Sequence, residues 1–121
     1  IQKLEGHKKW VTCLLDLRSY RIASGSIDCS IKIWNTLDGK CVNTIKGHRG
    51  FVFCLVMVND YIMASCSSDK TIKLWNYLDY KCIKTISGFT NSIWSICLLD
   101  KERYVAASNC DIIVGSLLFS N

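Results

Sequence analysis

The sequence predicts an all-β fold made of repeated antiparallel units, and three observations support this prediction. The stretch Ser24–Asn35 returns as Ser65–Asn76, an offset of 41 residues, and a fixed period of this size indicates a repeat architecture. Strand-forming Ile, Val, Thr, Tyr and Trp residues recur along the whole chain. The chain contains no proline, so the most common interruption of a strand ladder is missing.

The composition is that of one folded domain. A chain of 121 residues is long enough to bury a core, and only 21% of its residues are Asp, Glu, Lys or Arg, which argues against disorder. The net charge of +5 would favour an acidic protein partner or a nucleic-acid backbone, but the Lys and Arg residues are scattered. Charge alone therefore indicates no particular partner.

The first unit has room for four antiparallel strands. Alternation of apolar residues from Val11 to Leu17 predicts a first strand buried on both faces. Asp38-Gly39 is a hairpin signal before the last strand of the unit. The four strands are expected at residues 11–17, 21–26, 30–35 and 40–45. Residues 1–4 align with the end of such a fourth strand, so we expect the chain to begin inside a repeat and to be part of a longer protein.

The three units are expected at residues 6–46, 47–87 and 88–121, and the third has diverged from the others. Its first two strands are predicted at residues 93–99 and 104–108. Beyond them two alignments stay open, with either Gly115 or Leu117 at the position of the tryptophan, and in both alignments the tryptophan is lost. Residues 117–119 leave room for only part of a fourth strand.

Eight cysteines would suggest a disulfide framework, but their positions favour another explanation. Cys13 is equivalent to Cys54 and Cys41 to Cys82, as expected where adjacent units need a small apolar side chain at matching depth. No pair has the two-residue gap of a metal or redox motif. We expect reduced, buried thiols and a cytoplasmic or nuclear protein. Without a long apolar run or a signal peptide, no membrane association is expected.

Several residues recur together at fixed offsets in the two clear units. Each unit has Gly-His near its start, an Asp between its second and third strands, and Trp-Asn at the end of the third strand. In this combination the chain resembles the WD40 family of β-propellers, in which the last pair is usually Trp-Asp. The resemblance implies about three four-stranded blades and hence an incomplete propeller, because a ring needs about four to eight. It also implies two structural tetrads: His7, Ser24, Asp28 and Trp34, and His48, Ser65, Asp69 and Trp75.

Ser, His and Asp also make up a hydrolase triad, so catalysis is the competing interpretation. The set occurs twice in the chain, neither serine lies in a Gly-x-Ser-x-Gly elbow, and each serine lies in a strand expected to be packed. Neither histidine has another His or a paired Cys at ligand spacing. We therefore expect no catalytic residue, no metal site and no cofactor, and we interpret the tetrads as structural.

Basic and aromatic residues next to the repeated stretch form the predicted partner-binding face. Trp10 and Phe51 are equivalent positions at which surface contact and packing beneath the loop stay open, whereas Trp94 is expected to pack within its strand. The face consists of Lys8, Lys9, Trp10 and Ile27 in the first unit and Arg49, Phe51 and Ser68 in the second.

These observations favour a protein-interaction scaffold or adaptor without catalytic activity. Two alternatives stay open: binding of nucleic acid or an acidic ligand through the basic loops, and recruitment of substrates within a larger enzyme such as a ubiquitin ligase or a kinase. The outer faces of the first and last units should be covered by further blades in cis or by a second copy in trans. We expect the isolated chain to self-associate.

Overall fold

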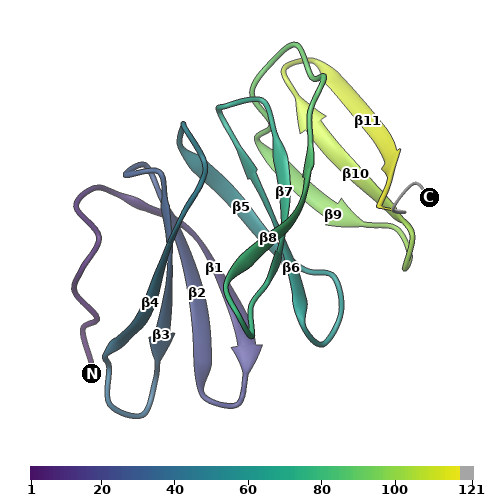
Figure 1. Cartoon of the computed structure of the whole chain (residues 1–121). Helices are drawn as coiled ribbons and strands as arrows, with labels where there is room; N and C mark the ends of the chain where they lie inside the picture. The colour runs from purple at the N-terminus through teal and green to yellow at the C-terminus, as the bar shows by residue number, and fades with distance from the viewer. Residues whose placement is uncertain (118–121) are drawn as a thin grey trace.

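The computed structural model of the chain describes residues 1–117, which form strands and turns and no helix. Three separate antiparallel sheets follow one another along the chain (Figure 1), and we call them blades one, two and three. Blade one contains β1 (Val11–Arg18), β2 (Arg21–Ser26), β3 (Ser30–Asn35) and β4 (Cys41–Lys46). Blade two contains β5 (Val52–Met57), β6 (Ile62–Ser67), β7 (Ile72–Asn76) and β8 (Lys81–Ile86). Blade three contains β9 (Ser95–Leu98), β10 (Arg103–Ser108) and β11 (Asp111–Ser116). The all-β prediction is confirmed.

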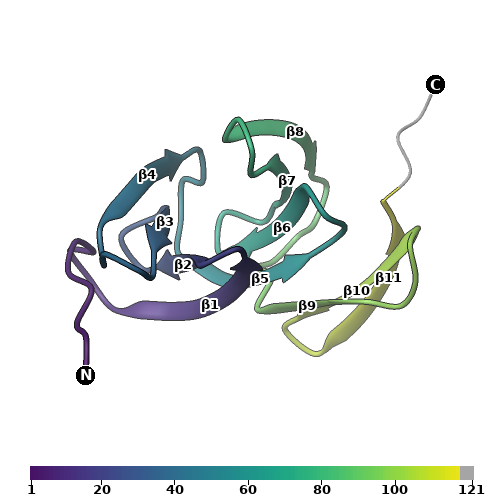
Figure 2. The same cartoon turned by 90° about the horizontal axis from the view of Figure 1, so that it is seen from below.

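The blades stand side by side in an open array. Within each sheet the strands pair in chain order, and the first strands β1, β5 and β9 lie next to one another along one edge of the array (Figures 1 and 2). The array does not close, so blades one and three each have a neighbour on one side only (Figure 2). No helix long and apolar enough to cross a membrane occurs within residues 1–117.

Two apolar cores lie between the blades, because alternate side chains of a strand point to opposite faces of its sheet. Ile31 and Ile33 of blade one are buried against Met63 and Trp75 of blade two. The other face of blade two packs on blade three in the same way. All six residues of β6 are buried, so the middle blade is the most enclosed part of the fold.

The expectation that the first strand is buried on both faces is wrong for β1. Leu14 is 67% exposed and Val11 is 50% exposed. In β5, the equivalent strand of blade two, no residue is exposed, because this strand has a blade on each side. The exposure of β1 therefore comes from the open array and not from a different local structure.

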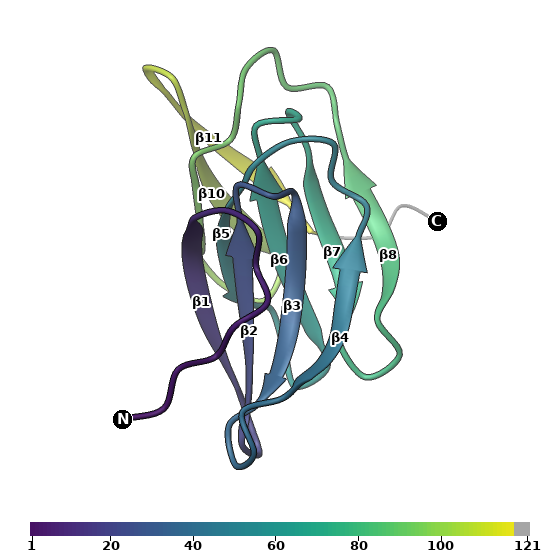
Figure 3. The same cartoon turned by 90° about the vertical axis from the view of Figure 1, so that its left-hand side faces the viewer.

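Residues 1–4 were expected to form the end of an outer strand, but they form none. The segment crosses the free face of blade one (Figure 3). Leu4 is half-buried and lines the same groove as Trp34, just as its repeat equivalent Ile45 is buried with Trp75. The segment thus lies where the outer strand of a preceding blade would lie, and no strand within residues 1–117 pairs with it.

Blade three has three strands in the described residues, where four were expected. Part of the fourth strand was expected near residues 117–119, and residues 118–121 lie outside the described part of the chain. Strand pairing decides between the two open alignments. Gly115 lies opposite Tyr104, as Trp34 lies opposite Ile22 in blade one. Gly115 therefore takes the tryptophan position, and Leu117 is buried beyond the end of β11.

The expectation of buried thiols is correct for Cys66 alone: three other cysteines are half-buried and four are exposed. The exposed ones are Cys41, Cys82, Cys97 and Cys110. Cys41 and Cys82 lie in β4 and β8, the outermost strands of their blades, where less protein covers the side chains. All eight cysteines are free thiols. The described residues also contain no cluster of His, Cys, Asp or Glu that could hold a metal ion.

Candidate functional site

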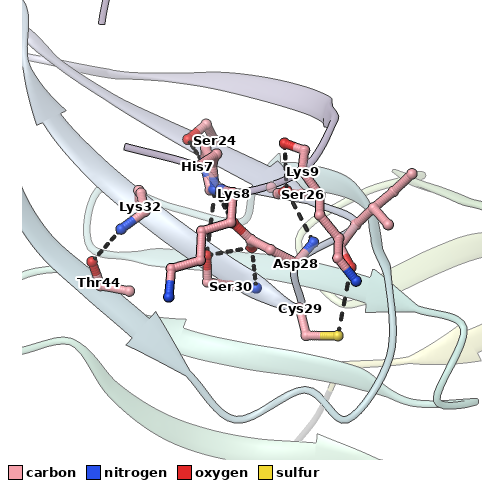
Figure 4. A network of polar contacts seen from close by, with 12 residues as sticks. His7, Lys8, Lys9, Ser24, Ser26, Asp28, Cys29, Ser30, Lys32 and Thr44 are labelled. Carbon is pink, nitrogen blue, oxygen red and sulfur yellow. Dashed lines mark hydrogen bonds and ion pairs between the residues drawn. The ribbon is translucent and has the colours of Figure 1, made fainter. Parts of the chain in front are cut away.

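A buried polar network ties the loop before β1 to the rest of blade one (Figure 4). The Ser24 hydroxyl accepts the indole N–H of Trp34 at 2.8 Å and lies 2.6 Å from Nε2 of His7. The His7 Nδ1 atom lies 2.9 Å from Oδ2 of Asp28. A neutral histidine with its hydrogen on Nδ1 satisfies every contact, because Ser24 then donates to Nε2 and His7 donates to Asp28.

Blade two repeats this network with nearly the same distances. Ser65 accepts the indole N–H of Trp75 at 2.8 Å and lies 2.6 Å from Nε2 of His48, whose Nδ1 lies 2.8 Å from Asp69. The structure therefore brings together all four residues of each predicted tetrad. Ser65 has no exposed surface, while Asp69 at the edge of the network keeps a small exposed fraction.

Each network contains a further hydroxyl that sequence reasoning missed. Ser30 Oγ donates to Asp28 Oδ1 at 2.6 Å, and Thr71 Oγ1 makes the same bond to Asp69 at 2.6 Å. The backbone N–H of Lys8 donates to the second carboxylate oxygen of Asp28 at 3.1 Å. The sequence could have predicted this contact, because a Ser or Thr lies two positions after the aspartate in both units.

The networks fix the charge state of their acidic members. Burial by itself would raise the pKa of the Asp28 carboxyl, but hydrogen bonds from Ser30, His7 and the Lys8 backbone hold it well below its usual range. Asp69 is shifted in the same direction for the same reasons. Burial lowers the pKa of His48, and the bond to Asp69 opposes this shift only in part. At neutral pH the carboxylates are charged and His48 is neutral.

The order of contacts in each network is that of a serine hydrolase triad, but the environment of the serine differs. Ser24 is 3% exposed and Ser65 is fully buried. Each serine oxygen already accepts an indole N–H, whereas a nucleophile must reach a substrate carbonyl. What the arrangement does is join a loop, a turn and two strands through satisfied hydrogen bonds.

The predicted face of blade one surrounds a shallow hollow. Its lining residues are Lys8, Lys9, Trp10 and Ile27. Trp10 is 80% exposed, while its backbone carbonyl accepts the N–H of Ile27 at 3.0 Å and the hydroxyl of Ser26 at 2.8 Å. For Trp10 the structure decides in favour of surface exposure, with its backbone fixed against the β2–β3 turn.

The predicted residues of blade two form an equivalent but smaller patch. Ser68 donates its N–H to the Phe51 carbonyl at 3.0 Å, and its hydroxyl accepts the Phe51 N–H at 2.8 Å. Arg49 is exposed, and Phe51 is 42% exposed. Phe51 thus combines packing and exposure, and the hydroxyl of Ser68 is used within the fold.

An aromatic row extends this patch toward blade three. The rings of Phe51 and Phe53 meet edge to face at 6.0 Å, and Phe53 stacks on Trp94 at 4.4 Å with an angle of 28°. Trp94 was expected to pack within its strand, but it packs on one ring face and remains 50% exposed. Sequence reasoning did not include Phe53 in the face, although its place two residues after Phe51 was a signal.

A family model for the WD domain, G-beta repeat (WD40) matches residues 1–35, 39–76 and 80–114. These three ranges cover most of the chain. The chain belongs to the WD40-repeat family. Proteins of this family are generally non-catalytic modules that bind other proteins or other blades. The match at 39–76 contains β4 together with β5 to β7, so one WD40 repeat begins with the outer strand of the preceding blade.

Proposed function

We propose that this WD40 chain is a protein-interaction scaffold that performs no chemistry and binds partners through the loops at the start of β1 and β5. The observation that carries the proposal is the exposure of Trp10 and Phe51 on backbone that is held by hydrogen bonds. Large aromatic side chains of this kind often dominate binding energies at protein interfaces. The buried serines support the absence of catalysis.

The tetrads contribute to this function by fixing the loops in advance. Asp28 binds both the side chain of His7 and the backbone N–H of Lys8, so the loop that carries Trp10 cannot move away from the β2–β3 turn without breaking these bonds. A surface that is already ordered loses less conformational entropy when a partner binds. We therefore separate the roles: the networks position the face, and the exposed side chains bind.

We further propose that the two outer faces of the array receive other blades. On blade three, Ile112 is 78% exposed and Val114 is 57% exposed. By strand pairing these residues correspond to Ile31 and Ile33, which are buried against blade two. The outer face of blade three is thus equivalent to the face of blade one that packs on blade two. Blades in cis and a second copy in trans would both supply the matching surface.

Nucleic-acid binding is the second candidate, and the exposed Lys8, Lys9 and Arg49 beside aromatic rings favour it. Such binding should weaken steeply with salt, because counterions are released from the phosphates.

We also propose a cytoplasmic or nuclear location, where exposed thiols such as Cys41 stay reduced. A place in a larger enzyme that recruits substrates would use the same loops.

Affinity capture with matched variants tests the scaffold proposal. Trp10→Ala with Phe51→Ala removes both rings from the face, and Leu37→Ala with Leu78→Ala makes an equal number of changes in exposed turns at the other end of the blades (Figure 1). Proteins captured by the natural chain should be lost with the first variant and kept with the second. Equal loss with both variants, or with neither, would refute the proposal.

A further inference from the structure

Blade one carries a second hollow that shares Lys8 with the one described above. We call the hollow lined by Lys8, Lys9, Trp10 and Ile27 the anchor hollow. The second, the basic hollow, is lined by Gly6, Lys8, Asp28, Ser30, Lys32, Thr44 and Lys46. The two hollows therefore adjoin at Lys8, beside the β2–β3 turn.

The basic hollow has an excess of positive charge. Three lysine side chains line it, and Asp28 is its only acidic lining residue. Both carboxylate oxygens of Asp28 already accept hydrogen bonds from within blade one. Lys32 donates to Thr44 at 2.9 Å (Figure 4), which holds one ammonium group over the hollow. An incoming carboxylate would meet fixed positive charge and free lysine hydrogens.

The anchor hollow is suited to an apolar side chain. Its lining joins the exposed ring of Trp10 to the half-buried Ile27, whose backbone N–H is bonded to Trp10. Burying the exposed indole surface of Trp10 under an apolar side chain would be favourable, because it removes apolar area from water. Lys8 and Lys9 at its rim favour negative charge next to this anchor.

We propose that blade one binds an acidic peptide segment of a partner protein, with one apolar side chain in the anchor hollow and carboxylates over the basic hollow. The proposal rests on the scaffold function proposed above and adds the chemistry of the partner. It assigns the site to blade one alone. In blade two the equivalents of Lys8, Lys32 and Lys46 are Arg49, Lys73 and Ser87, so one of the three positive charges is missing.

The amount of charge favours a peptide over nucleic acid. The two hollows together offer the four lysines Lys8, Lys9, Lys32 and Lys46 beside one carboxylate. Proteins that bind nucleic acid tightly neutralise roughly six to ten phosphates. A short acidic segment needs only a few positive charges and one apolar contact. Four lysines and one apolar anchor are enough for a short acidic segment, but they are too few positive charges for tight binding of nucleic acid.

Fluorescence anisotropy with a labelled peptide, Ser-Leu-Gly-Glu-Asp-Glu, tests the proposal directly. Three further probes serve as comparisons: the same peptide with alanine for leucine, the same peptide with lysine for each acidic residue, and a single-stranded oligothymidine. The protein variants are Trp10→Ala and Lys46→Glu, with Lys101→Glu as a matched charge change at an exposed position outside both hollows. Each variant is first checked for an unchanged unfolding midpoint.

The acidic peptide should bind, and loss of its leucine or of Trp10 should weaken binding about tenfold or more. Lys46→Glu should weaken it severalfold and Lys101→Glu should not, while the lysine peptide should not bind. Equal binding of the acidic and lysine peptides, no effect of Trp10→Ala, or preference for the oligothymidine would overturn the proposal. If the peptides fail while protein capture still depends on Trp10 and Phe51, the scaffold function stands and this inference falls.

Discussion

Ser65 and His48 meet at 2.6 Å inside blade two, and neither side chain is accessible to solvent to any useful extent. The serine oxygen also accepts the indole N–H of Trp75. The Ser65 hydroxyl is therefore the hydrogen-bond partner of two groups in this network, His48 Nε2 and the Trp75 indole N–H. This relationship makes Ser65 the member of the network whose removal should affect the others most.

Replacing Ser65 by alanine should destabilise the fold without changing its architecture. The change strands His48 Nε2 and the Trp75 indole, at a cost of about 1 to 3 kcal/mol for each unsatisfied group. Urea unfolding followed by tryptophan fluorescence measures this loss. Ser87→Ala, at an exposed position, is the matched control and should change the free energy of unfolding by less than about 0.5 kcal/mol. Equal effects of the two changes would show that Ser65 contributes no buried hydrogen bonds.

Acid should weaken the fold in two steps. The pKa of His48 is lower in the fold than its unfolded value of about 6.5, so the unfolded chain binds more protons as the pH falls below that value. This contribution is complete above about pH 6.5 and is lost on acidification. The pKa of Asp69 is also lowered, so its contribution is lost as the pH falls below about 4.

Unfolding free energies measured across this pH range test the assignment. His48→Gln removes the titrating group and should flatten the first step while leaving the second in place. A natural chain with constant stability between about pH 7 and pH 5, or an NMR titration that places His48 above its ordinary pKa, would contradict the neutral state of His48.

The ring of Tyr104 fills the space that a side chain at Gly115 would need, since an ideal Cβ there would overlap the ring. Gly115→Ala should therefore destabilise blade three by about 1 to 3 kcal/mol. Tyr104→Ala should also destabilise it by opening a cavity. In the double variant Tyr104→Ala with Gly115→Ala the new methyl group has room, so the combined loss should be smaller than the sum of the two single losses. Strict additivity in urea unfolding would contradict this packing.

The outer faces of the array should make the isolated chain associate. Leu14, Ile112 and Val114 are more than half exposed, and association would bury them. Ile112→Glu with Val114→Glu should shift the chain toward the monomer in gel filtration with light scattering. Leu37→Glu with Leu78→Glu, in exposed turns, should not. A natural chain that is monomeric at all concentrations tested would contradict the proposal for these faces.

Repeated features were predictable from the sequence because each prediction was supported twice. The strands of blade one follow from residues that occur at the same offset in two units. Both tetrads follow from the resemblance to the WD40 family that these recurring residues carry. Tyr104 and Gly115 were harder to interpret, because their relationship occurs once and only strand pairing reveals it. The exposure of Leu14 depends on the absence of a neighbouring blade, which is a property of the array and not of the strand.

The candidate face was predictable in part. Trp10 and Phe51 were identified by their equivalence, but equivalence alone did not show that Trp10 is almost twice as exposed as Phe51. Phe53 was missed because its partner Trp94 lies in the next blade. The basic hollow was missed because Lys32 and Lys46 come together with Lys8 only after the four strands of blade one are paired.

The central claim is that the buried networks stabilise the blades and the exposed loops bind the partner. The most direct measurement compares Ser65→Ala with Trp10→Ala in both stability and binding of a captured partner protein, under conditions where each variant is folded. Ser65→Ala should lower the free energy of unfolding and weaken binding much less than Trp10→Ala does, because it retains the side chains that contact the partner. Trp10→Ala should keep the stability within about 0.5 kcal/mol and lower the affinity about tenfold or more. Loss of affinity in the folded Ser65→Ala variant, with full affinity in Trp10→Ala, would contradict the account.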